Sequence, residues 1–133
     1  MTKLHDMGPG DQVTSVQWNN QGTLLAVGTH TGLLQIWDTV KNKVIKTLTG
    51  HDGRICAVAW NSTFLSTGSR DRSILHRDLR THNDFEAKLM GHRQEVCGLK
   101  WSFDEQQLAS GGNDNKLLIW SARNYAQPQA KFN

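Results

Sequence analysis

Hydrophobic and polar positions follow one pattern three times along the chain. The hexapeptides at 13–18, 55–60 and 96–101 each read apolar-x-x-apolar-x-Trp, and they begin 42 and 41 residues apart. Self-similarity at a fixed period of this size is the signature of a repeat architecture. Most of the sequence is therefore predicted to be scaffold, and function is to be sought where the three copies differ.

Further short apolar segments follow each hexapeptide. They are rich in β-branched residues, they are separated by Gly, Asn and Asp, and none keeps a helical period over three turns. The second segments lie at 25–28, 65–68 and 108–111, the third at 33–38, 73–78 and 116–121, and a looser fourth at 43–49, 85–90 and 127–132. Four short strands in each unit predict an all-β protein.

Two dipeptides mark the ends of these units. Gly50-His51 and Gly91-His92 precede the second and third units, while Trp37-Asp38 and Trp120-Ser121 close a third strand. Units of this length with these marks are typical of a WD-repeat β-propeller. We predict a partial propeller over 1–133, with four-stranded repeats at 13–49, 55–90 and 96–132. Residues 1–6 are predicted to form the outer strand of a preceding blade.

Three blades do not close a ring, because propellers typically have four to eight. An open arc leaves apolar faces and strand edges uncovered. We therefore expect the chain to be a piece of a longer protein, and assembly of several copies is the alternative.

A linked polar set recurs inside the repeats. A buried Trp N–H and a Ser hydroxyl need partners, and a His and a turn Asp can supply them. Recurrence favours a structural network over a catalytic triad, and the third blade is expected to have the most tightly tied turn because Arg77 replaces Trp in the second. The predicted members are His92, Ser110, Asp114 and Trp120 in the third copy and His51, Thr67 and Asp71 in the second.

Composition and charge narrow the function classes. The chain has 133 residues, of which 37% are hydrophobic and 20% charged, and its net charge is +3. We expect a soluble intracellular protein with no membrane partner, since no apolar run is long enough to span a bilayer. We expect no nucleic-acid partner either, because Asp71 and Asp78 interleave with the arginines at 70–80.

The sequence contains no motif typical of a metal or cofactor site. The histidines and cysteines lack zinc-ligand spacing, and no Gly-rich loop precedes a helix, so we expect no metal and no cofactor. Cys56 and Cys97 occupy equivalent positions in their repeats. Small, buried, reduced thiols are favoured there over a disulfide.

Variation among the copies concentrates in the polar turn before each third strand. The third copy places Asn113 and Asn115 around its Asp, and the second places Arg70 and Arg72 around the equivalent Asp. Asn and Gly also suit turns for backbone reasons alone. Because these turns open on one rim, the amide and guanidinium groups are candidates for binding a short peptide.

The third repeat, from Gly91 to Lys116, resembles the fizzy and fizzy-related family of WD-repeat activators of the anaphase-promoting complex. The segments at 26–30, 35–38, 68–72 and 77–81 are similar to the fizzy-related branch, while 82–88 and the tail after Ser121 depart from it. The resemblance implies a seven-bladed, non-catalytic substrate receptor of the nucleus and cytoplasm. It also implies that the chain corresponds to the second to fourth blades.

The same resemblance implies which motifs are recognised. The family's KEN-box receptor includes the two asparagines that match Asn113 and Asn115, and Arg70 and Arg72 are weaker candidates. Partners would be degron-bearing substrate or inhibitor proteins. The ligase itself would be contacted only through segments absent from this chain, as would the D-box, while a groove for an ABBA-type motif could lie between the first two blades. The alternative is a generic WD-repeat scaffold for protein interactions.

Overall fold

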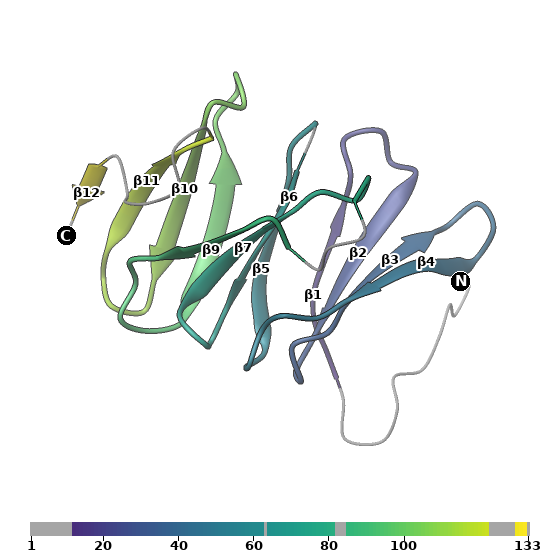
Figure 1. Cartoon of the computed structure of the whole chain (residues 1–133), viewed down its shortest axis with the longest axis horizontal. Coiled ribbons are helices and arrows are strands. Elements are labelled where there is room, and N and C mark those ends of the chain that lie inside the picture. The colour runs from purple at the N-terminus through teal and green to yellow at the C-terminus, as the bar shows by residue number, and fades with distance from the viewer. Residues whose placement is uncertain (1–11, 63, 82–84, 123–129, 133) are drawn as a thin grey trace.

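The computed structural model describes residues 12–62, 64–81, 85–122 and 130–132. All regular structure in these residues is β, in three antiparallel four-stranded sheets (Figure 1). The first sheet holds β1 (Val13–Trp18), β2 (Leu24–Thr29), β3 (Leu34–Asp38) and β4 (Lys43–Leu48). The second holds β5 (Ile55–Trp60), β6 (Leu65–Ser69), β7 (Ser73–Arg77) and β8 (Ala87–Met90). The third holds β9 (Val96–Trp101), β10 (Gln107–Gly112), β11 (Leu117–Ser121) and β12 (Ala130–Phe132).

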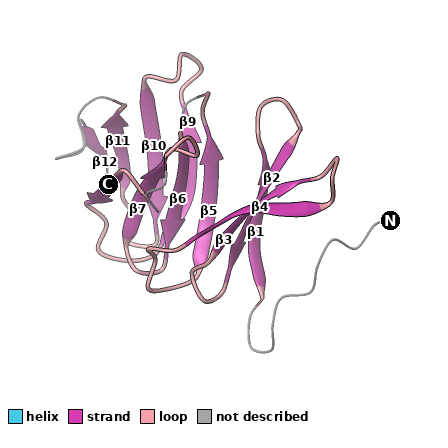
Figure 2. Cartoon of the chain, turned by 45° about the vertical axis from the view of Figure 1, so that its right-hand side comes forward, coloured by secondary structure: helices cyan, strands magenta, loops and turns pink. Residues whose placement is uncertain are grey.

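Each sheet is a meander, because its strands pair in the order in which the chain makes them. The first strand of each sheet pairs with one neighbour only, and β5 also contacts both β1 and β9. These three strands therefore form the inner edge of an arc of blades, and all three are labelled in Figure 2. Strands β4, β8 and β12 end the sheet order on the other side and form the outer edge.

Apolar side chains fill the two spaces between neighbouring blades. Between the first and second blades, Ala26, Leu34 and Ile36 pack with Ile55 and Leu65. A second cluster joins the middle blade to the third and includes the fully buried Trp120. The middle blade is covered on both faces, so every residue of β6 and β7 is buried. Burial of both faces explains why these strands lack a simple alternation of apolar and polar residues.

Close packing of neighbouring blades depends on one glycine in each of the second strands β2 and β6. A Cβ atom on Gly28 would lie 2.6 Å from Ile55 Cγ2, and one on Gly68 would lie 2.7 Å from Val96 Cγ1. The side chain that opens each next inner strand occupies the volume which a larger residue at the glycine would need. The glycines therefore set the distance between blades.

The predicted all-β fold of four-stranded blades is confirmed. Among the outer strands, β4 lies where it was predicted, whereas β8 begins at Ala87, two residues later than expected. The first residues of the strand predicted at 127–132 lie outside the described residues. An outer strand has one pairing partner and few core contacts, so its sequence carries a weak pattern. The predicted strand at 1–6 lies outside the described residues. No helix in the described part of the chain is long and apolar enough to cross a membrane.

Candidate functional site

A buried hydroxyl group links turn and strand in the third blade. Ser110 Oγ accepts a hydrogen bond from Trp120 Nε1 at 2.9 Å and lies 2.8 Å from His92 Nε2. His92 Nδ1 lies 3.2 Å from the carboxylate of Asp114, which also accepts from two backbone N–H groups. Because the indole can only donate, the hydroxyl donates its own proton to His92 Nε2 and leaves Nδ1–H for Asp114. The structure thus brings the four residues into one chain of hydrogen bonds.

The second blade builds the same chain with a different donor. Thr67 Oγ1 lies 2.8 Å from His51 Nε2 and accepts from Arg77 Nε at 3.1 Å. Arg77 is buried, and its Nη1 also donates to the carbonyl of Thr49 at 2.8 Å. His51 Nδ1 lies 3.0 Å from Asp71. An arginine therefore takes the position of the indole and keeps the network complete.

The turn of the second blade is the more tightly tied of the two, contrary to expectation. Besides His51 and two backbone N–H groups, Asp71 accepts from Ser73 Oγ at 2.6 Å. Lys116 occupies the equivalent position in the third blade, and its side chain offers Asp114 no hydroxyl. Burial opposes ionisation of Asp71, but the hydrogen bonds from His51 and Ser73 hold its pKa well below the usual range.

Ser110, His92 and Asp114 are arranged like a catalytic triad, but the hydroxyl group is buried and already hydrogen-bonded. Ser110 is 0% exposed, and its oxygen already carries the Trp120 N–H. A nucleophile must be reached by its substrate and activated by its base. This hydroxyl is enclosed, and the same arrangement recurs around Thr67. We therefore interpret the set as structural.

Three turns come together on one rim of the arc, each anchored to the start of an inner strand. His30 N donates to Gln12 O at 2.8 Å, Arg70 N to Arg54 O at 3.0 Å, and Asn113 N to Glu95 O at 2.9 Å. These bonds occur at equivalent positions of the three repeats. The rim is therefore built from two layers, the turns and the first residues before β1, β5 and β9.

One residue of each turn adopts a left-handed backbone conformation. It is Gly32 in the first blade (φ 95°), Arg72 in the second (φ 75°) and Asn115 in the third (φ 63°). Gly and Asn adopt this region readily, whereas Arg does so rarely. The turn geometry alone thus explains Asn115, but it does not explain Arg72.

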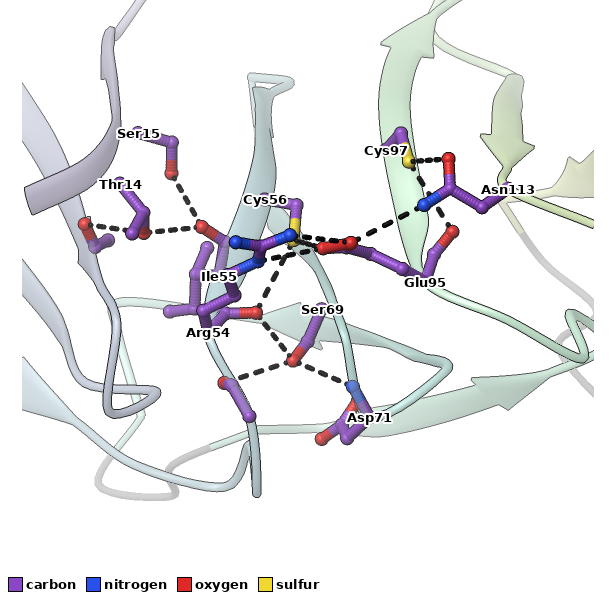
Figure 3. A network of polar contacts seen from close by, with 12 residues as sticks. Thr14, Ser15, Arg54, Ile55, Cys56, Ser69, Asp71, Glu95, Cys97 and Asn113 are labelled. Carbon is purple, nitrogen blue, oxygen red and sulfur yellow. Dashed lines mark hydrogen bonds and ion pairs between the residues drawn. The ribbon is translucent and has the colours of Figure 1, made fainter.

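Asn113 is held by the inner strand of its own blade (Figure 3). Its Oδ1 accepts from Cys97 Sγ at 2.9 Å, and its Nδ2 donates to Glu95 Oε1 at 3.4 Å. The side chain is exposed at the rim. An amide has two donor protons and two acceptor lone pairs, so one of each remains for a ligand.

An ion pair between neighbouring blades lies beside Asn113. The Arg54 guanidinium binds the Glu95 carboxylate through two parallel hydrogen bonds of 2.9 Å, and Cys56 Sγ donates to the same carboxylate at 2.8 Å (Figure 3). Hydrogen bonds from Arg54 and Cys56, with a smaller Coulombic contribution from Arg70, lower the pKa of Glu95 to about 2. Glu95 therefore stays ionised and orients the amide of Asn113.

Both thiols of the rim are free and protonated. Burial, together with the hydrogen bond to Glu95, raises the pKa of Cys56 to about 12. Burial and the charge of Glu95 also raise the pKa of Cys97. Reactive cysteines have lowered pKa values instead. The prediction that both are buried is wrong, since Cys97 is exposed and Cys56 half-buried on the open inner edge.

The predicted Asn and Arg pairs occupy neighbouring parts of the rim rather than one pocket. Asn113 lines a hollow with Arg54, Glu95 and both cysteines, mostly from the second and third blades and bordered by Thr14 of the first. Arg70 and Arg72 line another hollow, between the first and second blades. Arg54 borders both. Asn113 and the Arg pair are therefore adjacent and separated by the Arg54–Glu95 ion pair, whereas Asn115 lines neither hollow.

Sequence reasoning missed Arg54 and Glu95, although a signal for them exists. Each stands immediately before the first residue of its hexapeptide, where the first copy has Gln12. Opposite charges at equivalent positions of adjacent repeats predict an ion pair between blades once the repeats are known to stack. In the described residues, no cluster of three or more His, Cys, Asp or Glu side chains could hold a metal ion.

Two family models match the sequence. The Anaphase-promoting complex subunit 4 WD40 domain matches residues 2–63, and the WD domain, G-beta repeat, matches residues 83–121. Protein FIZZY-RELATED 3 of Arabidopsis thaliana is 54% identical over 121 residues, which make up 91% of this chain and 25% of that protein. Anaphase-promoting complex subunit cdh1 of Dictyostelium discoideum is 49% identical, over 97% of this chain and 17% of its own length.

A solved structure agrees with these sequence matches. A chain in the crystal structure of the mitotic checkpoint complex is 41% identical and superposes with a TM-score of 0.93, over 97% of this chain and 40% of that one. The chain belongs to the fizzy-related family. Its blades are WD repeats, as the dipeptide pattern predicted. The fizzy-related chain spans about a quarter of the length of relatives such as Protein FIZZY-RELATED 3.

Proposed function

We propose that these fizzy-related blades are part of a non-catalytic substrate receptor of the anaphase-promoting complex, and that Asn113 and Asn115 bind degradation motifs of the KEN type. Support comes from a relative that is named as a subunit of this complex and from the family resemblance of the turn. The partners would be degron-bearing substrate or inhibitor proteins. The complex itself would be contacted through other parts of a longer protein.

The Asn113 amide is the observation that carries this proposal. Glu95 and Cys97 each engage one side of the amide and fix its orientation at an exposed rim. The remaining N–H and lone pair form a preset donor and acceptor, which suits the amide and carboxylate groups of a short peptide. Preorganisation of this kind lowers the entropic cost of binding.

The proposed mechanism involves no bond making by the propeller. A receptor that holds a degron and a ligase together raises the effective concentration of one at the other. The enclosed Ser110 and the protonated thiols fit this role, since none of them offers an accessible activated nucleophile.

The test replaces Asn113 and Asn115 by alanine in the full-length protein. Loss of one or two amide hydrogen bonds is expected to weaken binding of a KEN peptide by about tenfold, because each bond contributes roughly 1 kcal/mol. A D-box peptide should bind as before. Asn42→Ala is the matched control, since Asn42 is also an exposed Asn with a positive φ of 55° but lies in the turn between β3 and β4.

Calorimetry with both peptides decides the assignment. Unchanged KEN affinity in the double variant contradicts a role for these asparagines. Binding of unrelated motifs but no degron on a peptide array would favour the alternative, a generic WD-repeat scaffold.

A further inference from the structure

A basic hollow lies on the rim between the first and second blades, next to the proposed degron site. Arg70, Arg72 and Arg54 line it together with His30 and Asp52; Gly53 and Asp71 complete the lining. It shares only Arg54 with the hollow that contains Asn113.

The charged side chains of this hollow differ in how directly they are paired. Arg54 is paired with Glu95, and Asp71 accepts hydrogen bonds from His51 and Ser73. Arg70 and Arg72 are exposed and form no ion pair with another described residue. The carboxylates of Asp52 and Asp71 balance the summed charge of the two guanidinium groups, but neither carboxylate forms an ion pair with them. The N–H donors of Arg70 and Arg72 therefore remain open to a ligand that can accept from both.

The backbone presents both arginines in fixed positions. Arg70 N donates to Arg54 O at 3.0 Å, and Gly53 lets the two segments approach, since a Cβ there would lie 3.3 Å from Arg70 Cβ. Arg72 is held at a φ of 75° by a turn that Asp71 ties on several sides. The equivalent residues are Gly32 and Asn115, which suit this conformation better. A strained residue on a rigid turn points to a function for its side chain.

We propose that this hollow binds an anionic side chain of the peptide that occupies the rim, either a carboxylate or a phosphorylated serine. Arginine is well suited to both groups, because its planar fork donates two parallel hydrogen bonds. Asp52 and Asp71 would repel the continuous phosphate run of a nucleic acid but leave room for one anionic group. The bound motif thus carries an acidic residue outside its core tripeptide.

This inference rests on the proposed function, because the acidic group belongs to the degron peptide that the rim is proposed to bind. The experiment therefore uses three KEN peptides in the full-length protein: one with glutamates in both flanks, one with glutamines there, and one with phosphoserine. A fourth peptide has the acidic flanks but no KEN tripeptide. The variant R70Q/R72Q removes the two charges. The variant R80Q/K88Q removes two exposed charges elsewhere and is the matched control.

Calorimetry is expected to show about fivefold tighter binding of the glutamate peptide than of the glutamine peptide, as befits a charge-assisted contact at an exposed site. In R70Q/R72Q the two peptides should bind with equal affinity, and the affinity of the glutamine peptide should be the same as in the wild type. In R80Q/K88Q the fivefold ratio should remain. If the phosphoserine peptide binds more tightly than the glutamate peptide to the wild type but not to R70Q/R72Q, the natural ligand group is a phosphorylated serine. N113A/N115A should weaken both KEN peptides while keeping their ratio.

The failures of the two proposals are distinguishable. A ratio that persists in R70Q/R72Q overturns the inference and leaves the degron site intact. If no KEN peptide binds, the proposed function fails, and the fourth peptide decides the inference: weak binding that needs Arg70 and Arg72 supports it, and no binding overturns it. Tighter, Arg70- and Arg72-dependent binding of a single-stranded DNA oligonucleotide would overturn the peptide assignment.

Discussion

At the scale of single residues, one hydroxyl group per blade holds turn, loop and strand together. Ser110 and Thr67 each accept one hydrogen bond from a strand donor and donate one to a histidine nitrogen. The donor is neutral Trp120 in the third blade and a buried guanidinium, Arg77, in the second. The two blades therefore satisfy the same hydroxyl group with different donors, and burial of the charged donor costs more desolvation free energy than burial of the neutral one.

This difference predicts the order of two destabilisations. Ser110→Ala leaves a buried N–H and a histidine nitrogen without partners, which should cost about 1–3 kcal/mol of unfolding free energy. Thr67→Val keeps the shape of the side chain but strips a buried cation of a hydrogen bond, and should cost more, since bonds to charged groups are stronger. Urea unfolding of both variants measures the order. Thr67→Ser, which keeps the hydroxyl, is the control, and equal losses in the first two variants would contradict the argument.

His76 predicts how stability depends on pH. It is 1% exposed, stacks between Phe64 and Trp101, and lies 2.7 Å from Ser66 Oγ. Burial lowers its pKa to about 4, whereas an unfolded histidine has a pKa near 6.5. Below pH 6.5 the unfolded chain therefore binds the extra proton, and stability falls as the pH decreases towards 4.

The slope of this loss is at most about 1.4 kcal/mol per pH unit for one group. Unfolding free energies measured between pH 5 and 8 should show it in the wild type and lose it in His76→Phe; below pH 5, protonation of carboxylates such as Glu95 in the unfolded chain adds its own slope. Replacement of the exposed His30 by glutamine should leave the slope in place. A slope that survives in His76→Phe would assign the effect to another group.

At the scale of the elements, the repeat-equivalent glycines of the second strands show how blades pack. Gly28 faces Ile55 and Gly68 faces Val96, each the first residue of the next inner strand. Gly111 occupies the same position in the third blade, and no described atom lies within 4 Å of the Cβ it would carry. The same sequence position is therefore crowded in two blades and open in the third.

The contrast predicts a matched pair of variants in this chain. Gly68→Ala forces the Val96 side chain and the third blade to move, and overpacking of this kind should destabilise by about 1–3 kcal/mol. Gly111→Ala has free space and should change stability by less than about 0.5 kcal/mol. Thermal unfolding followed by circular dichroism compares them. Equal effects would show that backbone entropy, and not packing between blades, determines how substitution of these glycines changes stability.

The sequence allowed the elements to be predicted where the repeat pattern is strong. The tryptophan hexapeptides located β1, β5 and β9, and the turns located the rim with Asn113 and Arg70. The partners of these residues could not be predicted, because Arg54 meets Glu95 only through the rotation between stacked blades. The position of that ion pair between Asn113 and the Arg pair is likewise a property of the stacking, which one repeat does not specify.

At the scale of the whole molecule, burial is distributed as in the middle of a larger ring. The middle blade has two fully buried central strands, whereas the innermost strand of the first blade and the outermost strand of the third expose large apolar side chains. Val16 and Trp18 of β1 are 54% and 49% exposed, and Phe132 of β12 is 54% exposed. Neighbouring blades on either side would cover surfaces of this kind.

A change of context for Gly111→Ala tests this view of the molecule. If a longer fizzy-related protein places another inner strand beside β10, that strand's first residue should occupy the volume next to Gly111, as Val96 does next to Gly68. The substitution that is neutral in the 133-residue chain should then cost about 1–3 kcal/mol in the longer one. Gly98→Ala is the control for both, since no described atom lies within 4 Å of its Cβ position on the inner strand β9. Equal, small effects of Gly111→Ala in both contexts would mean that the next blade packs differently from the three described.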